Sequence, residues 1–141
     1  MSEAQNMEVV REFTRTFKNE HKIDGLEQLF HKDFKHNFRS GLPDGVEGMK
    51  QLGAMLNSAF PDSSFTEKNL IASGDKVVER GATRATHKGS MMGEKPTNKA
   101  VHWSEINIYQ FKNGKIAEHW VEMEMWQLLE QIGILPALNV M

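Results

Sequence analysis

The spacing of the apolar residues changes at Pro61 and divides the chain into a helical half and a stranded half. Before Pro61, apolar side chains recur every three or four residues, as at Phe13 and Phe17 and along the run from Met49 to Ala59. This spacing is typical of helices that bury one face. After Pro61 polar and apolar residues alternate, which is typical of strands. Helices followed by a run of antiparallel strands predict an α+β fold, with helices packed on one face of a curved sheet.

Three helices are expected in the first half, each with a recognisable start. Ser2–Gln5 resembles a capping box, Asp24 can cap a short helix that reaches Phe30, and Asp44–Glu47 is a second box-like start. Pro61 ends the third helix, because the residue before a proline is pushed out of the α region.

Four strands and a short C-terminal helical turn are expected in the second half. The strands span Ser64–Ala72, Lys76–Thr86, Val101–Phe111 and Lys115 to about Glu124. Asn113-Gly114 joins the last two strands and is the strongest short hairpin signal a sequence can carry. Helices across the concave side of such a sheet leave a closed-ended cone, which is a natural pocket for a small molecule.

Composition limits the classes of function that the chain can serve. Its 141 residues suit a single domain over 1–141, and 17 basic against 19 acidic residues give a net charge of −2. That balance removes the electrostatic case for binding nucleic acid or a membrane surface. The absence of cysteine excludes disulfides, thiolate metal sites and a cysteine nucleophile. The sequence shows neither a signal peptide nor an apolar run long enough to span a membrane, so a cytoplasmic location is expected.

The last strand carries an unusual combination of carboxylates and an indole on one side. Alternation places four residues there: Glu118, Trp120, Glu122 and Glu124. Neighbours on this side are roughly 6.5 Å apart, and carboxylates that close beside an aromatic wall are suited to general acid/base work. The alternative is a solvated rim on which the indole packs alone. The opposite side, with His119 and Val121, is mostly apolar and calls for burial.

Other polar residues are candidates for a ligand site. Trp103, Glu105 and Asn107 share one face of the preceding strand, and alternation does not decide which face looks inward. Arg80 could orient an acidic or carbonyl-rich ligand, or simply pair with a glutamate. His36 could point into the cone or be satisfied by backbone.

The six histidines lack metal-ligand spacing, so no metal site is expected. The long segment from Lys88 to Ala100, which contains Met91 and Met92, is typical of a lid or binding loop.

Seven short motifs, weak singly, together resemble the SnoaL-like polyketide cyclase (ester cyclase) family from about Val9 to Gly133. They are Asp33–His36, Phe60–Asp62, Gly74–Arg80, Thr86–Gly89, Pro96–Thr97, Asn113–Trp120 and Gln131–Gly133. The resemblance implies the cone-shaped α+β barrel of nuclear transport factor 2, scytalone dehydratase and ketosteroid isomerase, with a mostly antiparallel sheet. It also implies a homodimer or higher homo-oligomer that binds a hydrophobic small molecule.

The family's reaction is an intramolecular aldol condensation that closes a ring in a polyketide ester without a cofactor. Its acid/base is an aspartate four residues after the tryptophan of the Glu-His-Trp motif, and Glu124 stands at that position here. The extra methylene displaces the carboxylate by more than about 1 Å, which can cost about a hundredfold in rate. Asn98 likewise replaces a frequent glycine, and asparagine is the next best residue for left-handed backbone.

The sequence therefore predicts Glu124 as the catalytic residue. The residues predicted to bind substrate are His36, Arg80, His87, Trp103, Asn107, Glu118 and Trp120. Two other readings remain open, because a fold does not fix a function. One is an isomerase, dehydratase or epoxide hydrolase on the same scaffold, and the last of these needs an arginine between two carboxylates. The other is a protein that binds a small apolar ligand, or serves assembly, without turnover.

Overall fold

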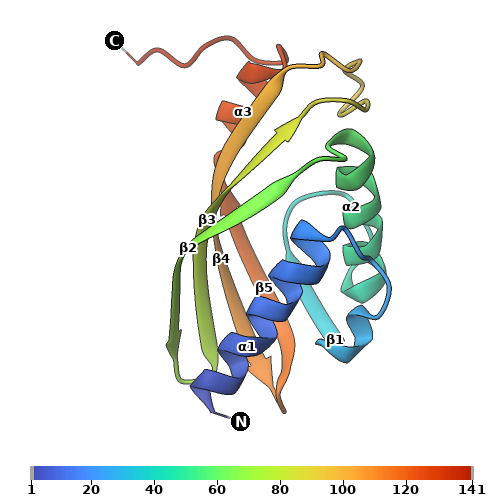
Figure 1. Ribbon diagram of the computed structural model, residues 1–141. Coiled ribbons are helices and arrows are strands. Elements are labelled where there is room, and N and C mark those ends of the chain that lie inside the picture. The colour runs from blue at the N-terminus through green and yellow to red at the C-terminus, as the bar shows by residue number, and fades with distance from the viewer. Residues whose placement is uncertain (1, 141) are drawn as a thin grey trace.

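A computed structural model describes residues 2–140 and contains one open, curved sheet of five strands (Figure 1). The strands are β1 (Phe30–Asn37), β2 (Ser64–Ser73), β3 (Lys76–Thr86), β4 (Ala100–Lys112) and β5 (Lys115–Met123). Their order across the sheet is β1-β5-β4-β3-β2. All neighbours pair antiparallel except β1 and β5, which are parallel.

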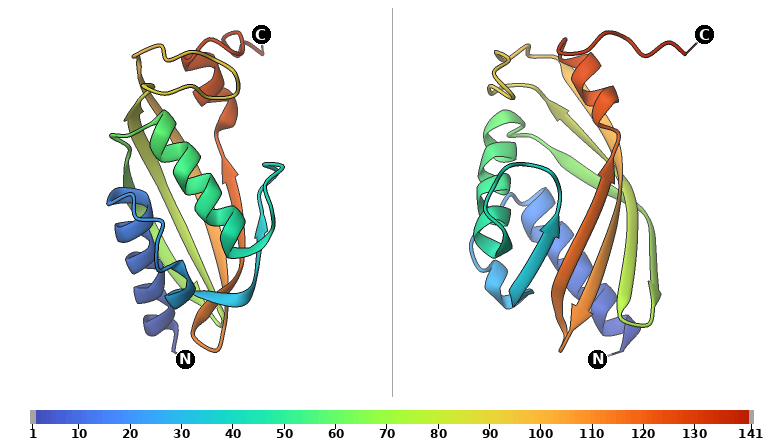
Figure 2. Two further views of the ribbon diagram at one scale, coloured as in Figure 1. Left: turned by 90° about the vertical axis from the view of Figure 1, so that its right-hand side faces the viewer. Right: turned by 180° about the vertical axis from the view of Figure 1, so that it is seen from behind.

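The helices lie on one side of this sheet. They are α1 (Glu3–Phe13), the π-helical turn η1 (Thr14–Asn19) that continues it, the 3-10 turn η2 (Leu26–Gln28), α2 (Gly45–Ala59) and α3 (Met125–Gln131). Figure 2 shows α1 and α2 side by side across the sheet, with α3 at the end where the chain terminates. The α+β fold with helices over the concave face of a curved sheet is thus confirmed. No helix within residues 2–140 is both long and apolar enough to cross a membrane.

Local sequence signals account for most element boundaries. The Ser2 side chain accepts from the Gln5 backbone and the Gln5 side chain accepts from Ser2, so the predicted capping box is present. β3 has the bounds that alternation predicted. Asn113 and Gly114 adopt φ angles of 53° and 77°, as a tight hairpin turn requires.

The segment after η2 differs from the expectation of a short helix up to Phe30. The helical part ends at Gln28, and β1 begins at Phe30. Only Phe30 and Phe34 are buried along this edge strand, so its side chains do not alternate, and its ladder is irregular between Phe30 and Lys35. An edge strand with few buried side chains carries little periodic signal.

Two buried clusters hold the helices against the sheet. In one, the Phe13 ring of α1 meets Phe30 edge-on at 5.0 Å between centroids and Tyr109 at 6.1 Å. In the other, Phe60 lies 5.2 Å from Trp103 near α3. These clusters fix the walls of a cavity, because residues of both contribute to its lining.

Candidate functional site

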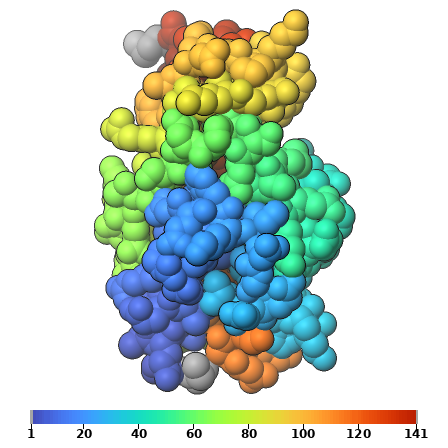
Figure 3. Space-filling model, turned by 45° about the vertical axis from the view of Figure 1, so that its right-hand side comes forward, coloured from blue at the N-terminus to red at the C-terminus, as the bar shows by residue number. Residues whose placement is uncertain are grey.

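A cavity of about 630 Å³ lies between the helices and the sheet. Its lining is dominated by aromatic and thioether side chains, including Phe17, Phe60, Met49 and Met123. α2 approaches η1 closely at Gly53, where a Cβ atom would lie 2.7 Å from the Phe17 ring. This size and lining suit an apolar ligand of moderate size. Figure 3 looks onto the helical side, where α1 and α2 cover the sheet and the loop between β3 and β4 lies above them.

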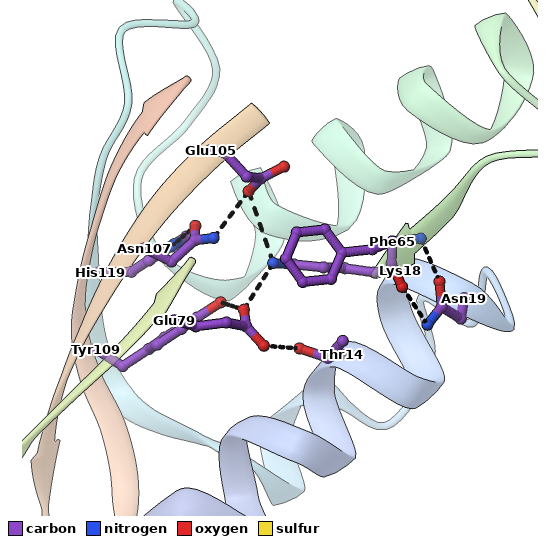
Figure 4. Close-up of polar contacts among 9 residues, drawn as sticks. All are labelled: Thr14, Lys18, Asn19, Phe65, Glu79, Glu105, Asn107, Tyr109 and His119. Carbon is purple, nitrogen blue, oxygen red and sulfur yellow. Dashed lines mark hydrogen bonds and ion pairs between the residues drawn. The ribbon is translucent and has the colours of Figure 1, made fainter. Parts of the chain in front are cut away.

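Three polar side chains from β4 and β5 line the cavity and bond to one another. Asn107 Nδ2 donates to Glu105 Oε2 at 2.9 Å, and Asn107 Oδ1 lies 2.8 Å from His119 Nε2 (Figure 4). Asn107 is fully buried, and the Glu105 side chain is 13% exposed. Strand alternation positions all three, because Glu105 and Asn107 on β4 and His119 on β5, which pairs with Tyr109, point to the covered face of the sheet.

Lys18 of η1 brings a positive charge to the same group of side chains. Its Nζ lies 3.6 Å from Glu105 Oε2 and 3.0 Å from Glu79 Oε1, and 4.0 Å from the centroid of the Phe65 ring. Glu79, on β3, is fully buried and also accepts from Thr14 Oγ1 at 2.6 Å. A carboxylate in such a place is costly unless it is paired and hydrogen-bonded, and here it is both.

Glu105 has one carboxylate oxygen that its neighbours leave free. Both close contacts, with Asn107 and Lys18, involve Oε2. Oε1 accepts no hydrogen bond within residues 2–140, and Figure 4 shows it turned away from both partners towards α2. The arrangement holds a carboxylate in one orientation and presents a free oxygen to an apolar cavity, which is suited to proton transfer.

His119 is held as a neutral imidazole. Asn107 donates through Nδ2 to Glu105, so its Oδ1 accepts a hydrogen bond from the N–H at His119 Nε2. Burial lowers the pKa of His119 well below 6.5, and His36 and Lys18 lower it further. The His119 ring stacks between Tyr109 and His36, with centroids 4.5 and 4.9 Å away. Burial also lowers the pKa of His36, while Asp44 opposes this shift.

Three of the residues expected to bind substrate line the cavity: His36, Trp103 and Asn107. The face of β4 that carries Trp103 and Asn107, which alternation left undecided, is therefore the covered one. His36 comes from β1 rather than from the end of a helix, and its ring stacks on His119.

Arg80, Glu118 and Trp120 lie on the opposite, uncovered face of the sheet. Arg80 Nε donates to Asn69 at 2.7 Å, and the Glu118 carboxylate accepts from Asn37 at 2.8 Å. The buried residues of β3 have the other parity, as do His119 and Val121 of β5, which line the cavity, so these three side chains turn away from it. The carboxylate–indole side of β5 is thus the outer side, because the helices cover the His119 side.

The structure places Glu124 and His87 beside the cavity rather than in its lining. Glu124 is the exposed N-cap of α3, and its carboxylate accepts from the Gln127 backbone at 3.4 Å. Its chain neighbours Met123 and Met125 do line the cavity. His87 is fully buried, and its Nδ1 accepts from the Thr97 backbone at 3.2 Å.

The loop after His87 contributes to the cavity, as its length and methionines suggested. Ser90, Met91 and Met92 line the cavity, and Met92 is 65% exposed. Asn98 has a φ of 59°, the left-handed conformation expected where relatives often carry glycine.

Lys18 and Glu79 were not anticipated, and Glu105 and His119 were named without a role. Glu79 carried a usable signal, because it is the one charged residue at the buried positions of β3. Lys18 carried none, since it meets Glu79 across 61 positions of sequence. In the described part of the chain, no group of three or more His, Asp or Glu side chains is placed to hold a metal ion.

The chain matches one known protein family and is similar to several solved structures. Residues 8–132 match the model of the SnoaL-like polyketide cyclase family. The crystal structure of AclR from Streptomyces galilaeus, proposed to be a hydroxylase, is 28% identical with a TM-score of 0.87, covering 99% of this chain and 91% of its own. TsrD from Streptomyces laurentii is 26% identical with a TM-score of 0.87, covering 96% and 99%.

IdmH from Streptomyces antibioticus, proposed to be a polyketide cyclase, is 25% identical with a TM-score of 0.78, and the match covers 92% of this chain and 99% of that one. No match was found among curated proteins.

Proposed function

Because the chain belongs to the SnoaL-like polyketide cyclase family, we propose that it catalyses an acid/base reaction on a hydrophobic small molecule bound in the cavity. The reaction we favour is intramolecular aldol ring closure. The single observation that carries the proposal is the free Oε1 atom of Glu105, a carboxylate oxygen facing an apolar cavity.

In this proposal Glu105 first acts as the base. Its Oε1 removes a proton from a carbon between two carbonyl groups, and the electron pair of the C–H bond moves into an enolate. The enolate carbon then attacks a second carbonyl of the same molecule, forming a C–C bond and an alkoxide. The alkoxide takes the proton back from Glu105, so atoms and charge balance. The ammonium of Lys18 stabilises negative charge nearby, and the cavity holds the reacting carbons together.

Glu124 is the competing assignment and remains the prediction of the family pattern. Its carboxylate is engaged in capping α3 and is exposed, whereas Glu105 is largely buried and faces the cavity. The two glutamates differ in position but are the same residue type. Replacing each with glutamine therefore gives a matched test.

The experiment follows proton removal directly. The protein is incubated in D2O with a tetralone β-keto ester, and NMR measures exchange of the proton between the two carbonyls. Wild type is compared with Glu105→Gln, Glu124→Gln and the outer-face control Glu118→Gln. We expect Glu105→Gln to slow the catalysed exchange at least about a hundredfold, because general base catalysis contributes that much or more. The other two variants should exchange as wild type does.

Each alternative result has a defined meaning. Loss of exchange in Glu124→Gln with retention in Glu105→Gln would return the role to the family position. Exchange at the uncatalysed rate with bound ester in every protein would refute the enzyme and support the second candidate, a ligand-binding protein without turnover. That candidate is favoured by one observation: Lys18, Asn107 and His119 already bond to side chains of the protein.

An epoxide hydrolase is less well supported. Arg80, the arginine available for a carboxylate–arginine–carboxylate trio, lies on the outer face. The cation that lies between two carboxylates, those of Glu79 and Glu105, is Lys18. Glu79 does not line the cavity, so it could not act on a bound epoxide.

We further propose that two copies pair through the outer face of the sheet. Four apolar side chains form one cross-strand row there: Ile71, Val78, Ile108 and Trp120. Ile71 is 59% exposed. Basic residues flank this row on β3 and glutamates on β5: Lys76, Arg80, Glu118 and Glu122. A two-fold axis would set the acidic side of one copy over the basic side of the other, as a self-complementary interface requires.

The cytoplasmic location expected from the sequence stays a prediction.

A further inference from the structure

Glu79 is a charged side chain that lies behind the cavity wall rather than in it. It is 0% exposed, and three side chains beside the site donate hydrogen bonds to it. Thr14 donates to Oε2 at 2.6 Å, while Lys18 and Tyr109 donate to Oε1 at 3.0 and 3.3 Å. Burying a carboxylate this deeply is costly, and its partners tie it to η1 on one side and to β4 on the other.

Lys18 links this hidden carboxylate to the one in the cavity. Its ammonium is 3.0 Å from Glu79 and 3.6 Å from Glu105, so Glu79 is the closer partner. The Phe65 ring covers the ammonium from β2 at 4.0 Å. Figure 4 shows Lys18 entering between the two carboxylates from the helix side. The position of the Lys18 ammonium is therefore determined by Glu79, a residue that does not line the cavity.

We propose that Glu79 is a positioning residue for Glu105 and acts on it through Lys18. By holding the ammonium on the Oε2 side, Glu79 keeps Glu105 in the orientation that leaves Oε1 free. Without Glu79 the ammonium would be drawn further onto Glu105 and would occupy the oxygen needed for proton transfer. The inference rests on the proposed role of Glu105 as the base, but the placement itself can be measured without any reaction.

The local backbone supports this assignment. Thr14 and Lys18, both bonded to Glu79, lie on η1, where α1 widens into a π-helical turn. Such turns are rare and frequently occur at functional sites. Asn19, at the end of the same turn, fixes it to β2 by accepting from the Phe65 backbone at 2.7 Å and donating to it at 3.2 Å.

Other charged or titratable groups surround Glu79 and Lys18, and the variants used in a test must leave these groups unchanged. Glu67 on β2, Tyr109 on β4 and His119 on β5 face the pair from the sheet, and burial together with Glu79 raises the pKa of Glu67. His36 and Arg39 line the cavity farther out. Among the residues that the structure describes, α2 adds no charged side chain to the lining. The variants below change none of these groups.

The test uses the full chain and NMR of two reporters. One is the side-chain amide of Asn107, which donates to Glu105; the other is the pair of ring nitrogens of His119, which is protonated on Nε2. We compare wild type with Glu79→Gln and Lys18→Met. The control is Asp62→Asn, which weakens two hydrogen bonds to Thr86 elsewhere in the fold. We expect both site variants to shift the Asn107 amide signals and to produce a mixture of His119 tautomers, with the control unchanged.

The outcomes separate positioning from stability. A folded Glu79→Gln protein with wild-type Asn107 and His119 signals would overturn the proposal, whatever its loss of stability. If Glu79→Gln does not fold, Lys18→Met decides, because unchanged signals in that variant would equally overturn it. Failure of Glu105→Gln to slow deuterium exchange would refute the proposed base. The signals of Glu79→Gln and Lys18→Met are measured without any reaction and would still report the placement, so the two failures are distinguishable.

Discussion

Along β4, alternate residues enter two different environments. Trp103, Glu105 and Asn107 face the helices, and Glu105 and Asn107 belong to a chain of hydrogen bonds and ion pairs. Ile106 and Ile108 face outward, and Ile106 is 46% exposed. The covered face thus carries the polar chain, and the uncovered face carries an apolar row. An isolated globular protein would favour the reverse, because burying charge is costly and exposing apolar area gains nothing. The inner polarity therefore points to chemistry, and the outer apolar row to association.

The largest expected effect comes from placing a charge in the outer row. Ile108→Lys should raise the dissociation constant of the dimer about a thousandfold, because a two-fold interface meets the substitution twice. Sedimentation over a range of protein concentrations measures this. Val140→Lys makes the same chemical change at a terminal residue that is 86% exposed and should leave the dimer intact. A wild-type protein that stays monomeric at high concentration would refute the association proposed for this face.

Two adjacent valines on β3 allow the contribution of each face to the free energy of unfolding to be compared. Val77 is fully buried under the helices, and Val78 lies in the outer row. We expect Val77→Ala to lower the free energy of unfolding by about 2 kcal/mol through the cavity it leaves. Val78→Ala should cost less than about 0.5 kcal/mol when measured on the monomer. Urea denaturation at low protein concentration gives both values. Equal losses would mean that both faces are packed alike.

The inner face should also make stability depend on pH in a defined window. Burial lowers the pKa of His119 well below 6.5, so the native state stays unprotonated where the unfolded chain binds a proton. Stability is therefore complete above pH 6.5 and falls as the pH drops below it, by up to about 1.4 kcal/mol per pH unit. His119→Phe should remove this part of the slope in urea titrations between pH 6.5 and about pH 5. An unchanged slope would contradict the burial of an unprotonated imidazole.

The smallest effect is spectroscopic. Trp103 lines the cavity, Trp120 lies on the outer face, and Trp126 is 38% exposed on α3. Binding of the tetralone β-keto ester should quench tryptophan fluorescence in wild type and in Trp120→Phe. Trp103→Phe should lose most of the quenching, since within residues 2–140 this is the one indole in the cavity lining. Persistence of the signal in Trp103→Phe would place the ligand elsewhere.

Alternation along each strand predicted which residues share a face, but it did not predict which face the helices cover. Trp103, Glu105 and Asn107 were grouped on one side of β4, and the structure shows them together. Which side is covered depends on where α1 and α2 pack, and this is a tertiary property. On β5 the carboxylate–indole side attracted the functional assignment, yet the apolar side with His119 and Val121 is the one that the helices cover.

The rest of the site depends on contacts between distant parts of the chain. The meeting of Lys18 with Glu79 and Glu105 requires α1 to widen at η1 and cross the sheet, and no local pattern specifies this. β1 was missed for a related reason, because a polar edge strand is fixed by its partner β5 rather than by its own alternation.

The loop between β3 and β4 is fastened at its base by the bond from the Thr97 backbone to His87. The part of the loop beyond this bond carries Met91 and Met92, which line the cavity. Thioether side chains repack at little cost. The end of the cavity near Met91 and Met92 should therefore accept ligand groups of more varied shape than the end near Glu105. A ligand's leading group meets the fixed geometry around Glu105 and Asn107, whereas its trailing group meets a yielding surface. Chemically related molecules with different tails should therefore compete for this one site.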